Sequence, residues 1–428
     1  MPSIDHVRRG CLILAGVCLL GTIVGVWSQT PAVWRPSLAL LCLLLPLGIG
    51  AVSALRGYQF TCWIVAAFTV AMIYPERFQS ISGVDLRHPW LILAVVQLVM
   101  FGMGTQMRIA DLAGVAKTPH AVGVGLLCQF TIMPLLGISL ATLFGLPKEI
   151  AAGVVLIGSC SSGLASNVMV YMARGNLALS VSLTTVATLL APLLTPLWMK
   201  LLAGELVEVR FVEMMINIIK IVIVPIGAAL LHDLLTQANP RIKQLVSWLA
   251  AFGCCWIATL IFWQLRTTPS EPATDGLILS GFLMGAIVFG FVYHQVVCRW
   301  PQLETAMPIV SMFGIVYFTL VTTAAGRDAL LDVGFWLFLT AMLHNLLGYC
   351  FGYGLSRAMG LDALSARTVA FEVGLQNGGM ASGLAGAMGK LGTVGLAAAI
   401  FSAWMNVSGS ILANYWRRRP TTILDEDA

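Results

Sequence analysis

Long apolar runs separated by short polar connections follow one another along almost the whole chain. Fourteen of these runs are candidate membrane spans, at residues 10–28, 36–55, 57–75, 89–107, 119–146, 150–173, 175–199, 211–234, 244–265, 277–298, 305–326, 333–356, 368–389 and 391–416. A transmembrane α-helix needs about 20 mostly apolar residues to cross about 30 Å of hydrocarbon. Charged residues lie in the connections, and only Lys220 and Glu372 stand well inside a run. The pattern therefore predicts an all-α polytopic membrane protein.

Composition narrows the class of protein further. The chain of 428 residues is 58% hydrophobic and 10% charged, whereas soluble proteins are about 25% charged. So few charges cannot cover a water-facing surface of this size, which excludes a soluble enzyme, a disordered chain and a nucleic-acid-binding protein. The connections are too short for a soluble domain, and the runs are longer than the strands of a membrane β-barrel.

Lysine and arginine are more frequent in the connections on the side of the N-terminus than in those on the other side. Cytoplasmic loops of membrane proteins carry such an excess. Because the number of spans is even, we expect a protein of the cell membrane with both termini in the cytoplasm.

Two spans carry small and polar residues at their middle. The sixth contains GSCSSGLASN at 158–167, and the thirteenth contains EVGLQNGG at 372–379. Such residues weaken a helix, and backbone leaves the helix at membrane depth only where protein or a polar cavity satisfies it. The two spans lie seven spans apart and so run in opposite directions. Paired interrupted helices in an inverted repeat are typical of secondary transporters, and the alternative is close helix packing through small residues.

Glu372 is the most costly residue of the chain to place in a membrane, because a bare carboxylate at mid-bilayer costs several kcal/mol. It must be protonated, paired or bound to a cation. Lys220 is one candidate partner, although its long side chain also suits it for reaching the membrane surface. The amides of Gln376 and Asn377 beside Glu372 favour a cation site instead.

Further oxygen donors stand in neighbouring spans. Ser180 and Thr184 are four residues apart and share one helix face, from which their hydroxyls can reach Ser166 and Asn167 across a short turn. Gln129 lies in the fifth span. The alternatives are hydroxyls bonded to their own helix and a glutamine that joins two helices. Oxygen donors with one carboxylate suit a hard monovalent cation, so sodium is the simplest candidate and protons are the alternative.

No motif of the chain indicates an enzyme or a cofactor. The ten cysteines lack metal-ligand spacing, the six histidines are dispersed, and no set of catalytic groups stands together. We therefore expect no enzymatic activity, no transition metal and no cofactor other than sodium as a coupling ion.

Several motifs together resemble the bile acid:sodium symporter (BASS) family. They are ASNVMVYMARGNLALSVSLTTVATLLAPLLTP at 165–196, FEVGLQNGG at 371–379, FSAWMNVSGSILANYW at 401–416, MFGMGTQM at 100–107 and QFTIMP at 129–134. The resemblance covers about 57–234 and 305–416. It implies an inverted-repeat secondary transporter of ten helices, with a panel domain, a core domain and two discontinuous helices that cross in the core and bind two sodium ions.

The resemblance also assigns residues. One sodium site would use Ser166, Asn167, Ser180, Thr184 and Glu372; the other would use Gln129, Glu372, Gln376 and the backbone carbonyls of Val373 and Leu375. Substrates of the family are organic anions, from bile acids to small carboxylates such as pantoate, and the substrate would lie against Gly163, Leu164, Asn377 and Asn406. The implied activity is sodium-coupled symport of an organic anion, and the alternative is a proton-coupled organic anion carrier or exchanger.

Four spans exceed the ten of the family. We expect an extra N-terminal pair in 1–56, a first repeat in 57–203, a second repeat in 204–420 with an inserted pair in 244–298, and a cytoplasmic tail in 421–428. Scaffolding within the lipid bilayer or packing in a homodimer would explain the extra pairs. The stretch Ser161-Ser162-Gly163-Leu164 and Met405 depart from the family at positions that would face the substrate, so the ion chemistry is better defined than the cargo.

Overall fold

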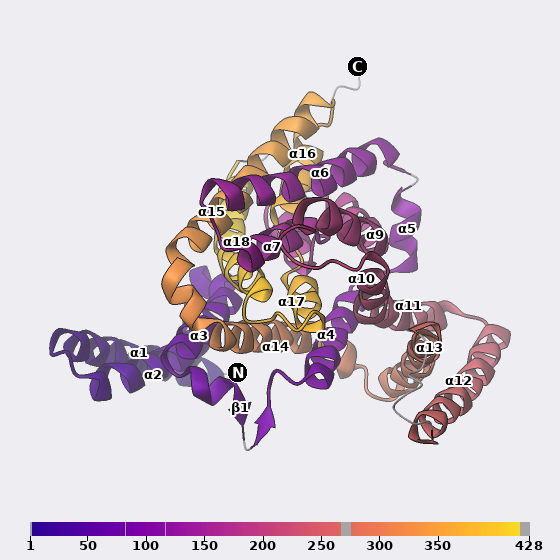
Figure 1. The fold of residues 1–428 in the computed structure, drawn as a ribbon, viewed down its shortest axis with the longest axis horizontal. Helices are drawn as coiled ribbons and strands as arrows, with labels where there is room; N and C mark the ends of the chain where they lie inside the picture. Colours follow the sequence, from indigo (N-terminus) through magenta and orange to yellow (C-terminus); the bar gives the residue numbers. More distant parts are fainter. Residues whose placement is uncertain (1, 82, 116, 267–274, 420–428) are drawn as a thin grey trace.

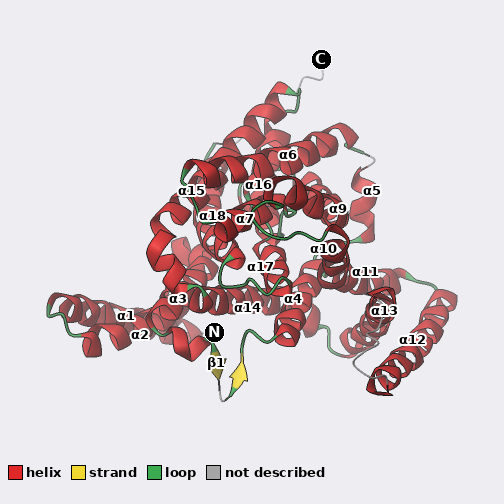
Figure 2. Ribbon diagram, in the orientation of Figure 1, coloured by secondary structure: helices red, strands yellow, loops and turns green. Residues whose placement is uncertain are grey.

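The computed structural model describes residues 2–81, 83–115, 117–266 and 275–419, and these are helical apart from one short hairpin and the connections (Figures 1 and 2). The helices are α1 (Pro2–Trp27), α2 (Pro31–Ile49), α3 (Gln59–Ile73), α4 (Pro89–Gly104), α5 (Ile109–Val115), α6 (Pro119–Leu143), α7 (Lys148–Ser159), α8 (Leu164–Met172), α9 (Leu177–Ala203), α10 (Phe211–Ile218), α11 (Val224–Gln237), α12 (Pro240–Arg266), α13 (Asp275–Arg299), α14 (Gln302–Ala325), α15 (Arg327–Ala358), α16 (Ala363–Gly374), α17 (Gly378–Ala387) and α18 (Val394–Arg417). A π-helical turn, Ile219–Ile223, joins α10 to α11, and 3-10 turns span Ser53–Tyr58 and Pro75–Phe78.

Every candidate span coincides with a helix or with a pair of consecutive helices. Ten helices of the described residues are long and apolar enough to cross a membrane, the α10–α11 segment among them, and α3 and α4 are shorter apolar helices. The sixth and thirteenth spans are each split in two, into α7 with α8 and α16 with α17. The predicted all-α polytopic membrane fold with two discontinuous helices is therefore confirmed. The predicted tail, 421–428, lies outside the described residues.

The two extra helix pairs lie at opposite ends of the molecule, α1 with α2 at one end and α12 with α13 at the other (Figure 1). Both pairs are poorly covered by protein: only 17% of the most apolar window of α1 and 11% of that of α13 are buried, against 67% for α18. Their apolar side chains therefore face the surroundings, as those of lipid-facing helices do.

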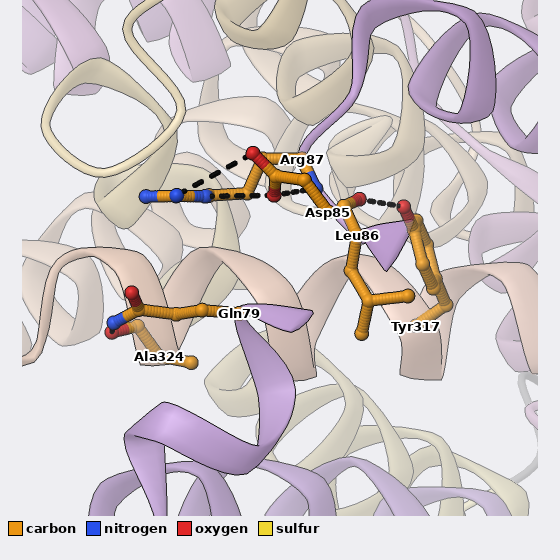
Figure 3. A network of polar contacts seen from close by, with 6 residues as sticks. All are labelled: Gln79, Asp85, Leu86, Arg87, Tyr317 and Ala324. Carbon is orange, nitrogen blue, oxygen red and sulfur yellow. Dashed lines mark hydrogen bonds and ion pairs between the residues drawn. The ribbon is translucent and has the colours of Figure 1, made fainter. Parts of the chain in front are cut away.

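A short hairpin, β1 (Ser80–Ile81) with β2 (Val84–Asp85), connects α3 to α4 and lies against α14 (Figure 3). The Tyr317 hydroxyl of α14 donates to the carbonyl of Leu86 just after the hairpin. The Gln79 amide donates to a carbonyl near the end of α14, at 3.3 Å. The loop is thus attached to the body at both of its ends.

The core of the molecule surrounds the interrupted helices. Every residue of α7 from Ile150 to Ser159 is buried, and so is almost all of α16 and α17. The end of α16 packs against α15 at Gly374, where an added Cβ would come within 2.2 Å of the Tyr349 ring. Asn345 of α15 donates to the Gly374 carbonyl at 2.7 Å. Glycine at this position therefore allows close approach, and the amide satisfies a carbonyl that the helix end leaves free.

Candidate ion and substrate site

The two interruptions lie against each other in the middle of the core. The chain is extended between α7 and α8 and again between α16 and α17, and Ser162 and Gln376 form an antiparallel β-bridge. The Asn377 N–H donates to the Ser161 carbonyl at 2.8 Å. Backbone groups that leave the helix at this depth need partners, and each interruption supplies partners for the other. The two discontinuous helices therefore meet at one point.

Glu372 lies at this meeting point, with only 2% of its surface exposed. Ser162 donates to Oε2 at 2.5 Å, Thr184 donates to Oε2 at 2.8 Å, and Ser180 donates to Oε1 at 2.5 Å. Asn167 completes the group, because its Oδ1 lies 2.7 Å from the Ser180 hydroxyl and 3.4 Å from that of Thr184. We call these five residues the carboxylate cluster.

The three hydroxyls of the carboxylate cluster make five close contacts with the oxygens of Glu372 and Asn167, which is more than their three protons can fill. The single proton of Ser180 faces both Glu372 Oε1 and Asn167 Oδ1, and a hydroxyl donates only one hydrogen bond. A bound cation or a proton on the carboxyl group would supply the missing positive charge. The geometry thus suits a small cation or a proton.

No basic side chain neutralises Glu372 in the part of the chain that the structure describes, where none of the ion pairs includes it. Lys220 is elsewhere, with its Nζ 5.9 Å from the centre of the Phe282 ring. The alternative of a structural Glu372–Lys220 pair is therefore wrong.

A second polar group lies on the α6 side of the interruptions. Gln129 of α6 donates to Gln376 Oε1 at 2.8 Å and to the Cys160 carbonyl at 2.9 Å. Gln376 in turn donates to the Val373 carbonyl at 2.7 Å. The oxygen of the Gln129 amide, Oε1, is buried without a partner. We call this group of two side chains and two carbonyls the amide cluster; it is electrically neutral and has one acceptor to spare.

The structure distributes the remaining predicted residues around these clusters. Ser166 donates to the Gly163 carbonyl at 2.7 Å, within the first turn of α8. Leu375 is fully buried between α16 and α17. Gly163 precedes α8 and faces the backbone of Asn377, since an added Cβ would lie 3.5 Å from the Asn377 Cα. Leu164 is the first residue of α8 and is partly buried.

The two asparagines predicted to face the substrate are also committed to local bonds. Asn377 Oδ1 caps α17 by accepting from the Met380 N–H at 2.9 Å, and its amide nitrogen lies 3.6 Å from the Met103 sulfur. Asn406 donates to the Ser402 carbonyl of its own helix at 2.7 Å. Both are buried, and among the described residues no hydrogen bond joins the two side chains.

Sequence reasoning placed Ser162 at a position that would face the substrate and did not expect it to donate directly to Glu372, as it does. The signal was present, because Ser162 belongs to the polar stretch at 158–167. It was not recognised because the direction of a side chain in an interrupted segment depends on where the helix ends. Gln129 and Gln376, 247 residues apart, were assigned to one site by the family resemblance alone, and the structure joins them by a direct hydrogen bond.

Comparisons with known proteins agree with this architecture. The model of the sodium bile acid symporter family matches residues 93–268. An uncharacterized sodium-dependent transporter of Bacillus subtilis (strain 168), YocS, is 32% identical over 372 residues, which are 87% of this chain and 94% of that protein.

Two further relatives are similar as well. The human ileal sodium/bile acid cotransporter is 30% identical over 312 residues, 71% of either chain. A probable chloroplastic sodium/metabolite cotransporter of rice, BASS1, is 29% identical over 361 residues, 84% of this chain and 73% of that protein. With relatives at this identity and coverage, interrupted helices that meet at a buried carboxylate, and the matching family model, the chain belongs to the sodium bile acid symporter family.

Proposed function

We propose that this membrane protein is a sodium-coupled symporter that moves an organic anion by alternating access. The observation that carries the proposal is the buried Glu372 carboxylate, which is held by hydroxyls alone at the meeting point of two interrupted helices. A charged group in this position is stable only when a cation accompanies it. Sodium-dependent or sodium-coupled transport is also what the names of the relatives state.

Sodium acts in this mechanism by neutralising Glu372 and by joining the segments that surround it. Hydroxyl and amide oxygens of Ser180, Thr184 and Asn167 belong to α8 and α9, whereas Glu372 belongs to α16. An ion shared by these oxygens holds the three helices together. Without it, the close oxygen pairs that lack a proton between them repel each other. A second ion at the amide cluster would use the free Oε1 of Gln129.

The organic anion follows from the orientation of the four half-helices. Helices α8 and α17 begin at the interruptions. A helix N-terminus carries a partial positive charge that favours a carboxylate. Gly163, Leu164 and Asn377 stand at these two ends. Asn406 of α18 bonds to Ser402, whose side chain lies against Gly378 at the start of α17. The cargo is a bile-acid-like molecule or a small carboxylate such as pantoate. Differential affinity for the two orientations of the site then drives the exchange between them.

The test begins with purified protein and a panel of steroid acids and small carboxylates, each screened for thermal stabilisation in sodium and in potassium. A compound that stabilises only in sodium is then offered to proteoliposomes under an inward sodium gradient. We expect sodium-dependent uptake that falls to background in Glu372→Ala and persists in Glu205→Ala, because Glu205 is an exposed carboxylate of the α9–α10 connection. Sodium-independent uptake that survives in Glu372→Ala would contradict the proposal.

A proton-coupled carrier or exchanger is the second candidate function. It is favoured by the same hydroxyl of Ser180, because a proton on Glu372 would also supply the missing donor. This mechanism predicts uptake that follows a pH gradient and ignores sodium. Proteoliposomes with opposed pH and sodium gradients separate the two functions.

The wider organisation belongs to the same proposal. It places the protein in the cell membrane with both termini in the cytoplasm, and it divides the chain into inverted repeats at 57–203 and 204–420 that form a panel and a core. The helix pairs in 1–56 and 244–298 lie outside the repeats and are candidate surfaces for a homodimer. Labelling of single cysteines introduced into the connections, with reagents that cannot cross the membrane, tests the orientation.

A further inference from the structure

A cavity of about 560 Å³ separates the inserted pair α12–α13 from the body of the transporter. Its walls come from α4, α11, α12 and α13, which lie together at one end of the molecule (Figure 1). Most of the lining is apolar, and Phe101, Pro225, Ile261 and Phe289 contribute to it. The cavity is separate from the carboxylate and amide clusters, and none of the residues of either cluster lines it.

The cavity lies in one leaflet of the membrane. Trp90 stands at the start of α4, Trp263 near the end of α12 and Leu277 near the start of α13. These three helix ends point to the same side, since α4 and α13 begin where α12 ends. Tryptophan is enriched at the level of lipid headgroups, so the two indoles mark the rim of the cavity at the membrane surface.

A positive charge borders the cavity. The Nζ of Lys220 lies 5.9 Å from the centre of the Phe282 ring, and the Lys220 carbonyl accepts from Gln97 at 3.0 Å. Both Phe282 and Gln97 line the cavity. None of the ion pairs of the described residues includes Lys220. A lysine inside a membrane segment is expensive and ordinarily finds a negative partner.

Lys220 lies between the bilayer centre and the rim of the cavity. At 1.5 Å per residue, Lys220 lies about 13 Å below the start of α10, Gln97 about 12 Å below that of α4 and Phe282 about 10 Å below that of α13. Helical side chains lean toward the helix N-terminus, so the ammonium of Lys220 rises from there toward the surface.

The backbone around Lys220 is also unusual. Residues Ile219–Ile223 form a π-helical turn between α10 and α11, and such turns are frequent at functional sites. The amide of Gln97 holds the carbonyl of Lys220 within this turn. The turn and its bond from α4 fix the side of the helix from which Lys220 extends.

We propose that this cavity binds an anionic phospholipid of the leaflet opposite the chain termini. One acyl chain fills the apolar space between the inserted pair and the body, and the phosphate region pairs with Lys220. A bilayer lipid is the occupant that the geometry supports, because α12 and α13 are sparsely buried at membrane depth and the Lys220 side chain extends from there toward the lipid phosphate and glycerol. The inserted pair would thus join the transporter partly through lipid.

The test compares lipids that differ only in charge. The full-length protein, purified in detergent, is mixed with equal amounts of phosphatidylglycerol and phosphatidylcholine that carry the same acyl chains, and bound lipid is counted by native mass spectrometry. We expect wild type to prefer phosphatidylglycerol and Lys220→Gln to lose about fivefold of that preference, the size of one basic residue near a membrane surface. Lys220→Arg retains the preference. Lys200→Gln, an exposed lysine near the end of α9, is the matched control and retains it too.

A second pair of variants tests the acyl chain. Gly285 lines the cavity and an added Cβ there would meet nothing within 4 Å, so Gly285→Leu fills the space without a backbone clash. We expect it to lower retention of both lipids, whereas Gly276→Leu, on the same helix and equally open, does not. Unchanged lipid preference in Lys220→Gln would overturn the proposal. So would Lys220-dependent binding of taurocholate without discrimination between the two lipids, because the cavity would then hold a water-soluble anion.

Discussion

The carboxylate cluster and the amide cluster lie on either side of the same two interruptions, yet they differ in charge and in how completely their atoms are paired. Glu372 brings a full negative charge that three hydroxyls address. Gln129 and Gln376 bring dipoles only, and the amide oxygen of Gln129 has no partner. A cation at the carboxylate cluster neutralises the charge of Glu372, whereas a cation at the amide cluster only receives an oxygen ligand from Gln129. The first cluster should therefore govern whether sodium binds at all, and the second should adjust how tightly it binds.

The largest effect is expected from Glu372→Gln. Sodium at 100 times its dissociation constant stabilises a protein by about 2.7 kcal/mol, and this variant should lose that gain because the charge is gone. In sodium-free potassium buffer, it should be at least as stable as wild type, since a buried amide costs less than a bare carboxylate. Thermal unfolding of purified protein in the two salts measures both quantities, with Glu205→Gln as the control. A variant that still gains stability from sodium would remove the distinction between the clusters.

The next effect is expected from the amide cluster. Gln129→Leu and Gln376→Leu each leave a buried partner without its hydrogen bond, which costs about 1–3 kcal/mol in either salt. The double variant should cost less than the sum, because neither partner is then left alone. Loss of an oxygen ligand should also weaken sodium affinity about tenfold without abolishing the response, since bonds to charged groups contribute about 1.5–3 kcal/mol. An unaltered sodium affinity would make the amide cluster purely structural.

A smaller difference should separate two serines of the carboxylate cluster. Ser180→Ala removes a hydroxyl that contacts both Glu372 and Asn167, at a cost of about 1.5–3 kcal/mol in the sodium-bound state. Ser162→Ala should cost less, because Thr184 still donates to the same carboxylate oxygen. Sodium titrations followed by thermal stability rank the two variants. The reverse order would mean that Ser162 is the more important donor.

The smallest effect concerns the surface ends of the interrupted helices. Glu149 in the first turn of α7 pairs with Lys390 in the connection after α17, and this hydrogen bond holds the pKa of Glu149 below its ordinary value of 4.5. A carboxyl group whose pKa is lower in the folded than in the unfolded state stabilises the fold fully at pH values above its ordinary pKa. This stabilisation is lost as the pH falls through the lower, folded-state pKa. Both side chains are more than one-third exposed, so the gain is below about 1 kcal/mol. The free energy of unfolding of wild type and of Glu149→Gln is measured between pH 6 and 3.5. The wild type should lose slightly more stability over this range than the variant, and equal pH dependence of the two proteins would contradict the assignment.

The membrane class and the positions of the spans could be predicted from the sequence because both follow from the local density of apolar residues. The contact of Ser180 and Thr184 with Asn167 was also accessible, since helical spacing places the two hydroxyls on one face. Interruption of the two spans could be inferred because Gly, Ser and Asn are concentrated at mid-span. The sodium and substrate assignments themselves remain predictions.

Other features depend on how distant segments meet. Ser162 reaches Glu372 only because α7 ends at Ser159, and helix ends are set by partners in other spans. That Lys220 does not pair with Glu372 could be seen only in the structure, where its ammonium lies over the ring of Phe282 in α13. The cavity beside α12 and the π-helical turn have no marker in the hydrophobic pattern. Side-chain geometry between helices therefore had to come from the structure.

The bond from the Asn377 N–H to the Ser161 carbonyl joins the interruptions through main-chain atoms. We call this main-chain link between the interruptions the seam. It does not depend on which side chains the two residues carry, and only a proline at the donor position would remove it. A residue beside it that lies outside the carboxylate cluster, such as Leu164, can be exchanged while the crossing keeps its geometry. A transporter built in this way can acquire a new cargo by changing a few side chains along the seam and retain the same ion-coupled framework.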